Sequence, residues 1–391
     1  MTWKVTNMED QKRQFVLLWK TNKFTMSELC RDFGITRPTG YKILHRFEEE
    51  GWDALVEQSR RHNSHPNSTP QEMVDAILEI RNKYPRWGAR KVVAILEREW
   101  ESESIPCHST VNAIMRRHGM TVPRRRSIKK IANQFPVFDP VNPNEIWSAD
   151  FKGKFRMGNK VYCHPLTIAD SKSRYLFAIK GMENPTTEGA KPVFERVFRE
   201  HGLPLYLHTD NGAPFGSALS LRRMTRLSAW IMEIGITPVY SDPGHPEQNG
   251  RHERMHRDLK AASTRPPAGC LVSQQKVFEK FMKEYNNERP HEALNMKMPS
   301  DIHIRSTREY PRIIRDWDYA KEISARYVSG NGAIRWGSND WIMISTALAG
   351  KYVGMEEVGT GLWKLYYRHV ELGYYEERSN TVYEIEDIDL Q

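Results

Sequence analysis

The chain changes its hydrophobic period at Trp147, and this change limits the folds that it can adopt. Before Trp147, apolar residues recur at the spacing of amphipathic helices, whereas after it short β-branched and aromatic runs alternate with helical patterns. The order strand, strand, strand, helix, strand, helix, strand, helix predicts an α/β domain with a mixed sheet. Short Trp- and Tyr-rich strands with Gly turns then predict a small, all-β, barrel-like module at the C-terminal end.

The first helical pattern predicts a helix-turn-helix module. Thr25 is expected to cap a short helix in a capping box with Glu28, and Gly34 to end that helix. The next helix is expected to start after Thr36, with Pro38 in its first turn. Its inward face is expected to consist of Tyr41, Leu44 and Phe47.

The opposite face of this second helix is polar and basic. A helix-turn-helix protein places such a face in the major groove of DNA. A plain three-helix bundle with a solvated face would show the same pattern, so this alternative stays open. The residues expected to contact DNA are Arg37, Thr39, Lys42, His45 and Arg46.

A second module repeats the plan, and two modules in tandem suggest a long DNA site. Its candidate recognition helix is expected to be capped by Ser109 and to bring Arg116 and Arg117 to DNA. A basic linker follows, in which prolines prevent a helix and a cluster of cations is expected to lie along phosphates. These linker residues are Arg124, Arg125, Arg126, Lys129 and Lys130.

The predicted domain organisation has five parts. They are a helix-turn-helix domain at 1–60, a second at 68–122, the basic linker at 123–142, the α/β core at 143–310 and the β module at 311–391. The net charge of +9 favours a polyanionic partner such as double-stranded DNA. Four scattered cysteines predict reduced thiols in a cytoplasm, and no run of apolar residues is long enough for a membrane span.

Three acidic residues stand where a carboxylate is expected to be functional. Asp150 falls within the first strand between aromatic residues, Asp210 ends a strand at a tight turn, and Glu253 begins a helix. Carboxylates are the ligands of hard divalent cations, and polynucleotidyl transfer uses two such ions roughly 3.5–4 Å apart. The helix of Glu253 is expected to present a strip that suits a phosphate backbone, formed by Asn249, Glu253, His256, Arg257 and Lys260.

Four segments of this chain resemble the DDE transposases of bacterial insertion sequences and the related retroviral integrases. They are WSADFKG, HTDNGAPF, GHPEQNGRHERMHRDLK and YNNERPHEALNMKMPSD. The resemblance covers nearly the whole chain. It implies a ribonuclease H-like core in which Asp150, Asp210 and Glu253 form a metal-binding catalytic triad with two Mg²⁺ ions, for which Mn²⁺ can substitute. It further implies cleavage and strand transfer at terminal inverted repeats, by at least a dimer assembled on DNA.

Two features depart from the pattern of that family. Forty-two residues separate Asp210 from Glu253, which is somewhat longer than usual and suggests a larger helix or loop there. The His/Cys zinc module of retroviral integrases is absent, and the helix-turn-helix modules stand in its place.

Two other functions compete with this interpretation. His252, Glu253 and His256 form a literal HExxH, the zinc-protease signature, with Glu279 or Glu284 available as a third ligand. A DNA-binding regulator with an inert core is the other alternative. Among lesser signals, Asp170 is expected to be a structural turn residue, and His208 either touches substrate or fills its strand.

Overall fold

The computed structural model divides into two compact units, Met1–Gln71 and Glu72–Gln391, which are described separately. It describes residues 7–56, 68–101, 104–121, 139–151, 153–217, 220–241, 250–337 and 340–385.

The first unit is a three-helix module, as predicted. It contains α1 (Met8–Lys20), α2 (Met26–Asp32), α3 (Arg37–Glu50) and the 3-10 turn η1 (Gly51–Leu55). The Thr25–Glu28 capping box forms in full and starts α2. Gly34 adopts a φ of 64°, which favours glycine and allows the turn into α3.

The packing of α3 differs from the prediction at one position. Leu44 is buried, but Tyr41 is 57% exposed and does not belong to the inward face. Gly40 is buried instead, and a Cβ at that position would meet Cys30 Sγ at 2.7 Å. The absence of a side chain lets α3 approach α2 closely and turns Tyr41 outward.

The second helical module belongs to the larger unit. It contains α4 (Gln71–Lys83), α5 (Ala89–Glu99) and α6 (His108–Arg117), packed around Met73, Ile77, Val92, Leu96 and Val111. The predicted cap at Ser109 is wrong. Cys107 has the extended conformation of an N-cap, so Ser109 lies inside the first turn, with its Oγ 3.0 Å from Cys107 Sγ.

The core is built on a mixed sheet, as predicted, and the sheet has six strands, one more than the predicted order. Its strands are β1 (Ile146–Phe151), β2 (Phe155–Arg156), β3 (Tyr162–Asp170), β4 (Leu176–Met182), β5 (Tyr206–Thr209) and β6 (Thr237–Tyr240). The order is β2-β3-β1-β5-β6, and β4 also pairs with β3. β1 pairs with β3 antiparallel and with β5 parallel, so β1 lies centrally.

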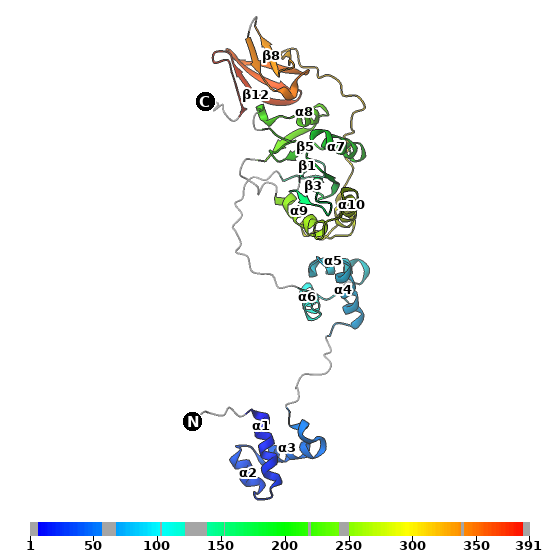
Figure 1. Cartoon of the computed structure of the whole chain (residues 1–391), viewed down its shortest axis with the longest axis vertical. Coiled ribbons are helices and arrows are strands. Elements are labelled where there is room, and N and C mark those ends of the chain that lie inside the picture. Colours follow the sequence, from blue (N-terminus) through cyan, green and yellow to red (C-terminus); the bar gives the residue numbers. More distant parts are fainter. Residues whose placement is uncertain are drawn as a thin grey trace. The chain divides into compact units, whose positions relative to one another are not determined.

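Helices cover both faces of this sheet (Figure 1). On one face, α7 (Thr187–His201) and α8 (Arg226–Glu233) pack on a cluster that includes Trp147, Leu166 and Ile168. On the other, α9 (Gly250–Ser263) and α10 (Leu271–Asn287) pack on a cluster that includes Cys163 and Ile179. The alternation of strand side chains therefore decides which helix pair each residue meets.

One core helix has a well-defined start. α8 begins at Arg226 after a capping box of Thr225 with Ser228. Before it, Arg222 has a φ of 49° within a short 3-10 turn, η3 (Leu221–Arg223).

The C-terminal part is all-β, as predicted, but a closed barrel is not shown. It contains β7 (Ser324–Tyr327), β8 (Ala333–Trp336), β9 (Asp340–Met343), β10 (Tyr352–Gly359), β11 (Leu362–Tyr367), β12 (Val370–Glu376) and β13 (Thr381–Tyr383). Five of these form an antiparallel sheet in the order β13-β12-β11-β10-β7, and β8 with β9 forms a hairpin. Among the described strands, β13 and β7 do not pair with each other.

This β module packs on the core through α8. Met224 and Met232 belong to the same buried cluster as Val353 and Leu365 of the module. Short elements complete the unit: η5 (Glu292–Leu294), α11 (Pro299–Ile302) and η6 (Thr346–Leu348). In the part of the chain that the structure describes, no helix is long and apolar enough to cross a membrane.

Candidate active site

Two of the three predicted carboxylates stand at the ends of neighbouring parallel strands. In the register of β1 and β5, Ala149 pairs with Thr209. Asp150 follows Ala149 and Asp210 follows Thr209, so the two aspartates continue that register. Adjacent strands lie about 4.8 Å apart and paired residues point to the same face, so both carboxylates occupy one edge of one face.

That face is the one covered by α9. Trp147 and Ala149 point into the cluster under α7 and α8, so Ser148 and Asp150 point to the opposite side. The side chain of Asp150 is 18% exposed and lies near His256 of α9, with Nδ1 3.4 Å from Oδ2. Asp150 is thus held at the boundary between the sheet, α9 and solvent.

The turn after β5 holds Asp210. The Gly212 N–H donates to Asp210 Oδ1 at 3.3 Å, and the Asn211 amide donates to the Ser241 carbonyl at 2.6 Å. Burial raises the pKa of Asp210, and the Gly212 hydrogen bond opposes this shift. A partly buried carboxylate beside another carboxylate is an environment that a cation would stabilise.

The predicted strip on α9 divides into two faces. Glu253, Arg257 and Lys260 are exposed, as a basic strip beside a carboxylate requires. His256 is only 1% exposed and packs into the core instead, because α9 lies flat on β1 and β3. Asn249 lies outside the described residues.

The donor set fits a hard divalent cation, although the third ligand is not in place. Asp150 and Asp210 offer carboxylate oxygens from rigid neighbouring strands, which suits Mg²⁺. Glu253 sits on the adjoining helix, one turn before His256. Within the described ranges, no three His, Cys, Asp or Glu side chains converge closely enough to form a ready metal site.

The HExxH motif does not build a zinc site in this structure. His252 and His256 are both buried, and each Nε2 lies within hydrogen-bond distance of the Thr167 hydroxyl, at 2.7 and 2.8 Å. His252 Nδ1 lies 2.9 Å from Ser148 Oγ. The two nitrogens that would bind zinc are therefore turned into the protein, while Glu253 faces outward.

The predicted DNA contacts are exposed wherever the structure describes them. On α3 these are Arg37, Thr39, Lys42, His45 and Arg46, and on α6 they are Arg116 and Arg117. The five linker residues Arg124, Arg125, Arg126, Lys129 and Lys130 lie outside the described residues. Their roles in DNA binding stay predictions.

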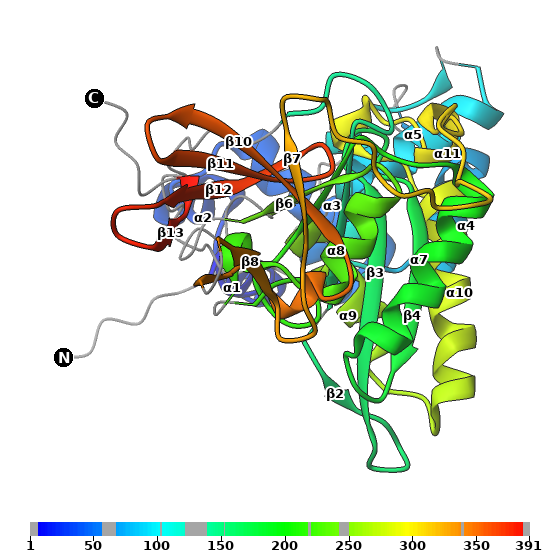
Figure 2. The same cartoon turned by 90° about the horizontal axis from the view of Figure 1, so that it is seen from above.

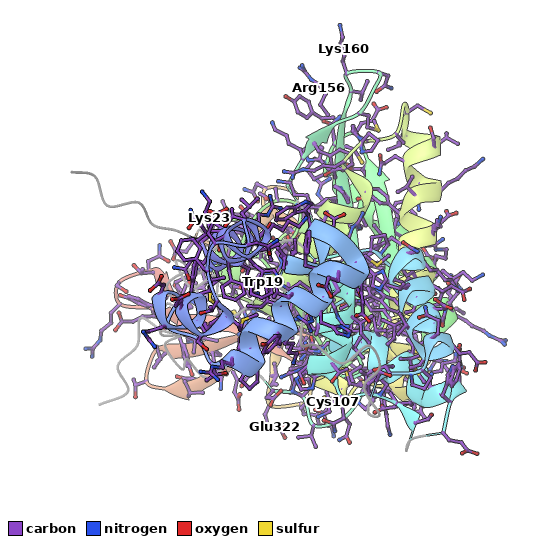
Figure 3. All side chains as sticks on the ribbon, turned by 90° about the horizontal axis from the view of Figure 1, so that it is seen from below. Trp19, Lys23, Cys107, Arg156, Lys160 and Glu322 are labelled. Carbon is purple, nitrogen blue, oxygen red and sulfur yellow. The ribbon has the colours of Figure 1, made fainter. Side chains whose placement is uncertain are left out.

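Sequence reasoning missed a basic hairpin formed by β2 and the start of β3. Figure 2 shows this hairpin projecting beyond the rest of the sheet, and Figure 3 shows Arg156 and Lys160 on it. Lys154 and Arg156 lie over the Tyr162 ring, 4.9 and 5.2 Å from its centroid. The alternating basic residues of KGKFRMGNK were the available signal.

Two of the lesser predictions have clear outcomes. Asp170 Oδ2 accepts from the Ser173 N–H at 2.8 Å and from its hydroxyl at 2.5 Å, which confirms a structural turn residue. His208 Nε2 lies 3.0 Å from Ser241 Oγ, and burial lowers the pKa of its imidazole. His208 therefore fills its strand under the candidate site.

A second charged cluster joins α5 to α9 and α10. Arg289 donates to Asp258 at 2.5 Å, and Lys91 of α5 lies among these groups. Burial, reinforced by Arg289, lowers the pKa of Lys91 to about 8. Burial also lowers the pKa of His291 to about 3. These residues pack α5 against α9 and the end of α10.

Family comparisons identify the same two kinds of domain. Descriptions of an integrase core domain match residues 140–246 and 234–299, a helix-turn-helix domain matches 11–62 and a homeodomain-like domain matches 39–115. The integrase-core matches contain all three predicted carboxylates. They agree with the mixed sheet and with the ribonuclease H-like core that the resemblance implies.

Known proteins of insertion elements are similar over most of their length. A 31.7 kDa protein of insertion element IS407 from Burkholderia multivorans is 25% identical over 260 residues, 65% of this chain and 90% of that protein. The transposase InsD of insertion element IS2 from Escherichia coli is 24% identical over 291 residues, 71% of this chain and 90% of that protein.

Among solved structures, the HTLV-2 integrase catalytic core in complex with magnesium is similar with a TM-score of 0.34 and 18% identity, covering 42% of this chain and 100% of that one.

The integrase-core and helix-turn-helix matches, together with the insertion-element relatives, relate this chain to the DDE transposases of insertion sequences. Its function is therefore in DNA transposition and integration.

Proposed function

We propose that this protein binds the terminal inverted repeats of an insertion sequence and catalyses metal-dependent DNA cleavage and strand transfer at Asp150, Asp210 and Glu253. The observation that carries the proposal is the parallel pairing of β1 with β5, whose last pair, Ala149 and Thr209, directly precedes Asp150 and Asp210. Two carboxylates on one edge, beside an exposed carboxylate on α9, match the ligand requirements of polynucleotidyl transfer.

Asp150 and Asp210 would hold Mg²⁺, and Glu253 would complete the ligand set from α9. When bound, the metal would supply activation of the attacking oxygen and stabilisation of the leaving oxygen. Arg257 and Lys260 follow Glu253 on the exposed side of α9, where they would hold the DNA backbone near the carboxylates.

The helix-turn-helix faces would select the DNA. The exposed residues of α3 and α6 would contact phosphates first and base edges second, and the basic linker would follow the backbone. Because an element has two ends, we infer at least a dimer assembled on DNA. We place the activity in the bacterial cytoplasm, in keeping with the four free cysteines.

The test is a strand-transfer assay with candidate terminal-repeat duplexes and Mg²⁺ or Mn²⁺. Wild type is compared with Asp150→Asn, which keeps the volume of the side chain and removes its charge. Glu279→Gln is the matched control, because Glu279 is an exposed carboxylate on α10 and the third ligand of the zinc hypothesis.

Metal-dependent products that disappear in Asp150→Asn and persist in Glu279→Gln would support the proposal. Salt-sensitive binding to the repeats without nicked or joined DNA would favour the regulator with an inert core. Equal activity of Asp150→Asn and wild type would overturn the assignment of the carboxylates.

A further inference from the structure

The two histidines of the HERMH segment share one hydrogen-bond partner. His252 and His256 are 3% and 1% exposed, and their rings lie 4.6 Å apart and nearly perpendicular. Both reach the hydroxyl of Thr167, the residue that pairs with Asp150 across β3 and β1. The motif therefore forms a buried polar connection between α9 and the strand that carries Asp150.

The chemistry of a hydroxyl assigns the direction of these bonds. A threonine hydroxyl has one proton and accepts two hydrogen bonds. His256 Nδ1 faces the Asp150 carboxylate, which only accepts, so neutral His256 carries its proton on Nδ1 and accepts the Thr167 proton at Nε2. Thr167 then accepts from His252 Nε2, and its oxygen also lies 3.0 Å from the Asp150 carbonyl. Both imidazole rings are thereby fixed in orientation.

This orientation directs the second nitrogen of each ring. His252 Nδ1 accepts from the Ser148 hydroxyl at 2.9 Å, whereas His256 Nδ1 lies 3.4 Å from Asp150 Oδ2. His256 thus reaches the carboxylate of Asp150 directly and the backbone of the same residue through Thr167. His252 also contacts Thr167, but its other nitrogen points to Ser148. Of the two motif histidines, His256 is therefore the one whose second nitrogen points to the Asp150 carboxylate.

We propose that His256 is a positioning residue that orients the Asp150 carboxylate toward Asp210, so that divalent-metal affinity depends on the His256–Asp150 contact. The proposal rests on the proposed function, in which Asp150 binds the metal. Partners that orient metal ligands typically contribute about 10–100-fold in metal affinity. The same contact ties α9, and with it Glu253, to the strand of Asp150.

Two conservative substitutions separate the two contacts of His256. In His256→Asn the side-chain amide occupies the place of Nδ1 and can still donate to Asp150, while the Thr167 contact is lost. In His256→Gln the amide reaches the place of Nε2 and retains Thr167, while the Asp150 contact is lost. A purely structural role predicts that Gln is the better replacement, and a positioning role predicts that Asn is.

The measurement is Mn²⁺ binding to the full-length protein by isothermal titration calorimetry, without DNA, together with the thermal unfolding midpoint of each variant. Asp150→Asn reports whether Asp150 binds metal at all. His303→Asn is the matched control, because His303 is a partly buried histidine that stacks on Tyr175 at 4.1 Å, away from Asp150.

We expect His256→Gln to weaken Mn²⁺ binding by about tenfold or more and His256→Asn to stay close to wild type. His303→Asn should lower the unfolding midpoint and leave Mn²⁺ binding unchanged. If Asp150→Asn weakens binding but His256→Gln does not, the positioning role is wrong and the proposed function stands. If wild type and Asp150→Asn bind Mn²⁺ equally, the metal assignment of the proposed function fails.

Discussion

Asp150 and Asp210 continue the parallel register of β1 and β5, one residue beyond the pair of Ala149 and Thr209. Asp150 lies in β1 and Asp210 directly follows the last residue of β5, so the register brings both carboxylates to the same face of the sheet. Burial raises the pKa of Asp210, so the charged form of this carboxylate is unfavourable for folding at neutral pH. The conflict between stability and charge at this edge is a property expected of a functional site.

The first prediction concerns Asp210→Asn. Burial raises the pKa of the Asp210 carboxyl above its ordinary value of 3.8. The folded protein therefore binds this proton more tightly than the unfolded chain does. That contribution to stability is present below pH 3.8 and is lost as pH rises through the raised pKa. Without divalent metal at pH 7.5, Asp210→Asn should therefore raise the unfolding midpoint, while strand transfer falls below detection.

Differential scanning fluorimetry with and without Mg²⁺ checks this prediction. Mg²⁺ should stabilise wild type and have little effect on Asp210→Asn, since a ligand stabilises only the state that binds it. A variant that is less stable than wild type without metal would show that the carboxylate is structural.

The sequence predicted those parts of the fold that depend on local rules. The capping box of Thr25 and Glu28, the place of Asp150 in a strand and that of Asp210 at a turn depend on neighbouring residues, and the structure has them. Whether the three carboxylates act in catalysis is a separate question, which the experiments above address.

What could not be predicted depends on tertiary contacts. Tyr41 fits the apolar period of α3, but the close approach of two helices at Gly40 sets the rotation of the helix. His256 fits a basic strip beside Glu253, but the flat packing of α9 on β1 and β3 turns it inward. A helical pattern gives the spacing of a face, and only the neighbours decide which way that face points.

The second prediction concerns Gly40→Val. A Cβ at position 40 would meet Cys30 Sγ at 2.7 Å and Met26 Sδ at 2.9 Å, so a larger side chain must push α2 and α3 apart. Overpacking of this kind costs roughly 1–3 kcal/mol. Denaturant unfolding should show this loss for the first helix-turn-helix unit, with weaker binding to terminal-repeat DNA.

Gly34→Asn provides the control for Gly40→Val. Gly34 has a φ of 64°, a backbone conformation that Asn tolerates, and a Cβ at that position would meet no atom of the described residues within 4 Å. The variant should lose less stability than Gly40→Val. Equal stability of Gly40→Val and Gly34→Asn would show that the helix crossing adapts to the added volume.

The third prediction concerns Glu233→Gln at the junction of α8 and the β module. The Glu233 side chain is 10% exposed, lies 2.5 Å from Lys351 Nζ and accepts from the Tyr367 hydroxyl at 2.9 Å. Loss of its charge should cost up to about 1 kcal/mol, because the Lys351 ammonium is 46% exposed and water screens much of the ion pair. Urea unfolding followed by tryptophan fluorescence measures the change.

Ultraviolet titration distinguishes the loss of the Glu233–Tyr367 contact from a general loss of stability. Burial and the Glu233 carboxylate together raise the pKa of Tyr367, so ultraviolet titration of Glu233→Gln should show this tyrosine ionising at lower pH. Glu356→Gln is the control, since Glu356 accepts from the partly exposed Tyr366 hydroxyl at 2.8 Å. It should change stability less than Glu233→Gln.

The fourth prediction concerns the pH dependence of stability that Lys91 contributes. Burial and Arg289 lower the pKa of Lys91 from 10.5 to about 8, so its charged form destabilises the folded protein. Between about pH 8 and 10.5 the unfolded chain holds a proton that the folded protein has released. The contribution of Lys91 to the free energy of unfolding should therefore rise with pH across this window and stay at its lowest value below it.

Lys91→Met keeps the length of the side chain and removes its charge. The variant should be more stable than wild type at pH 7, and the difference should shrink as pH rises from about 8 toward 10.5. Chemical denaturation at a series of pH values measures this, with the exposed Lys280→Met as control. Lys91 lies near the Arg289–Asp258 pair. If the free energies of unfolding of Lys91→Met and wild type changed with pH in parallel, Asp258 would already compensate the buried charge.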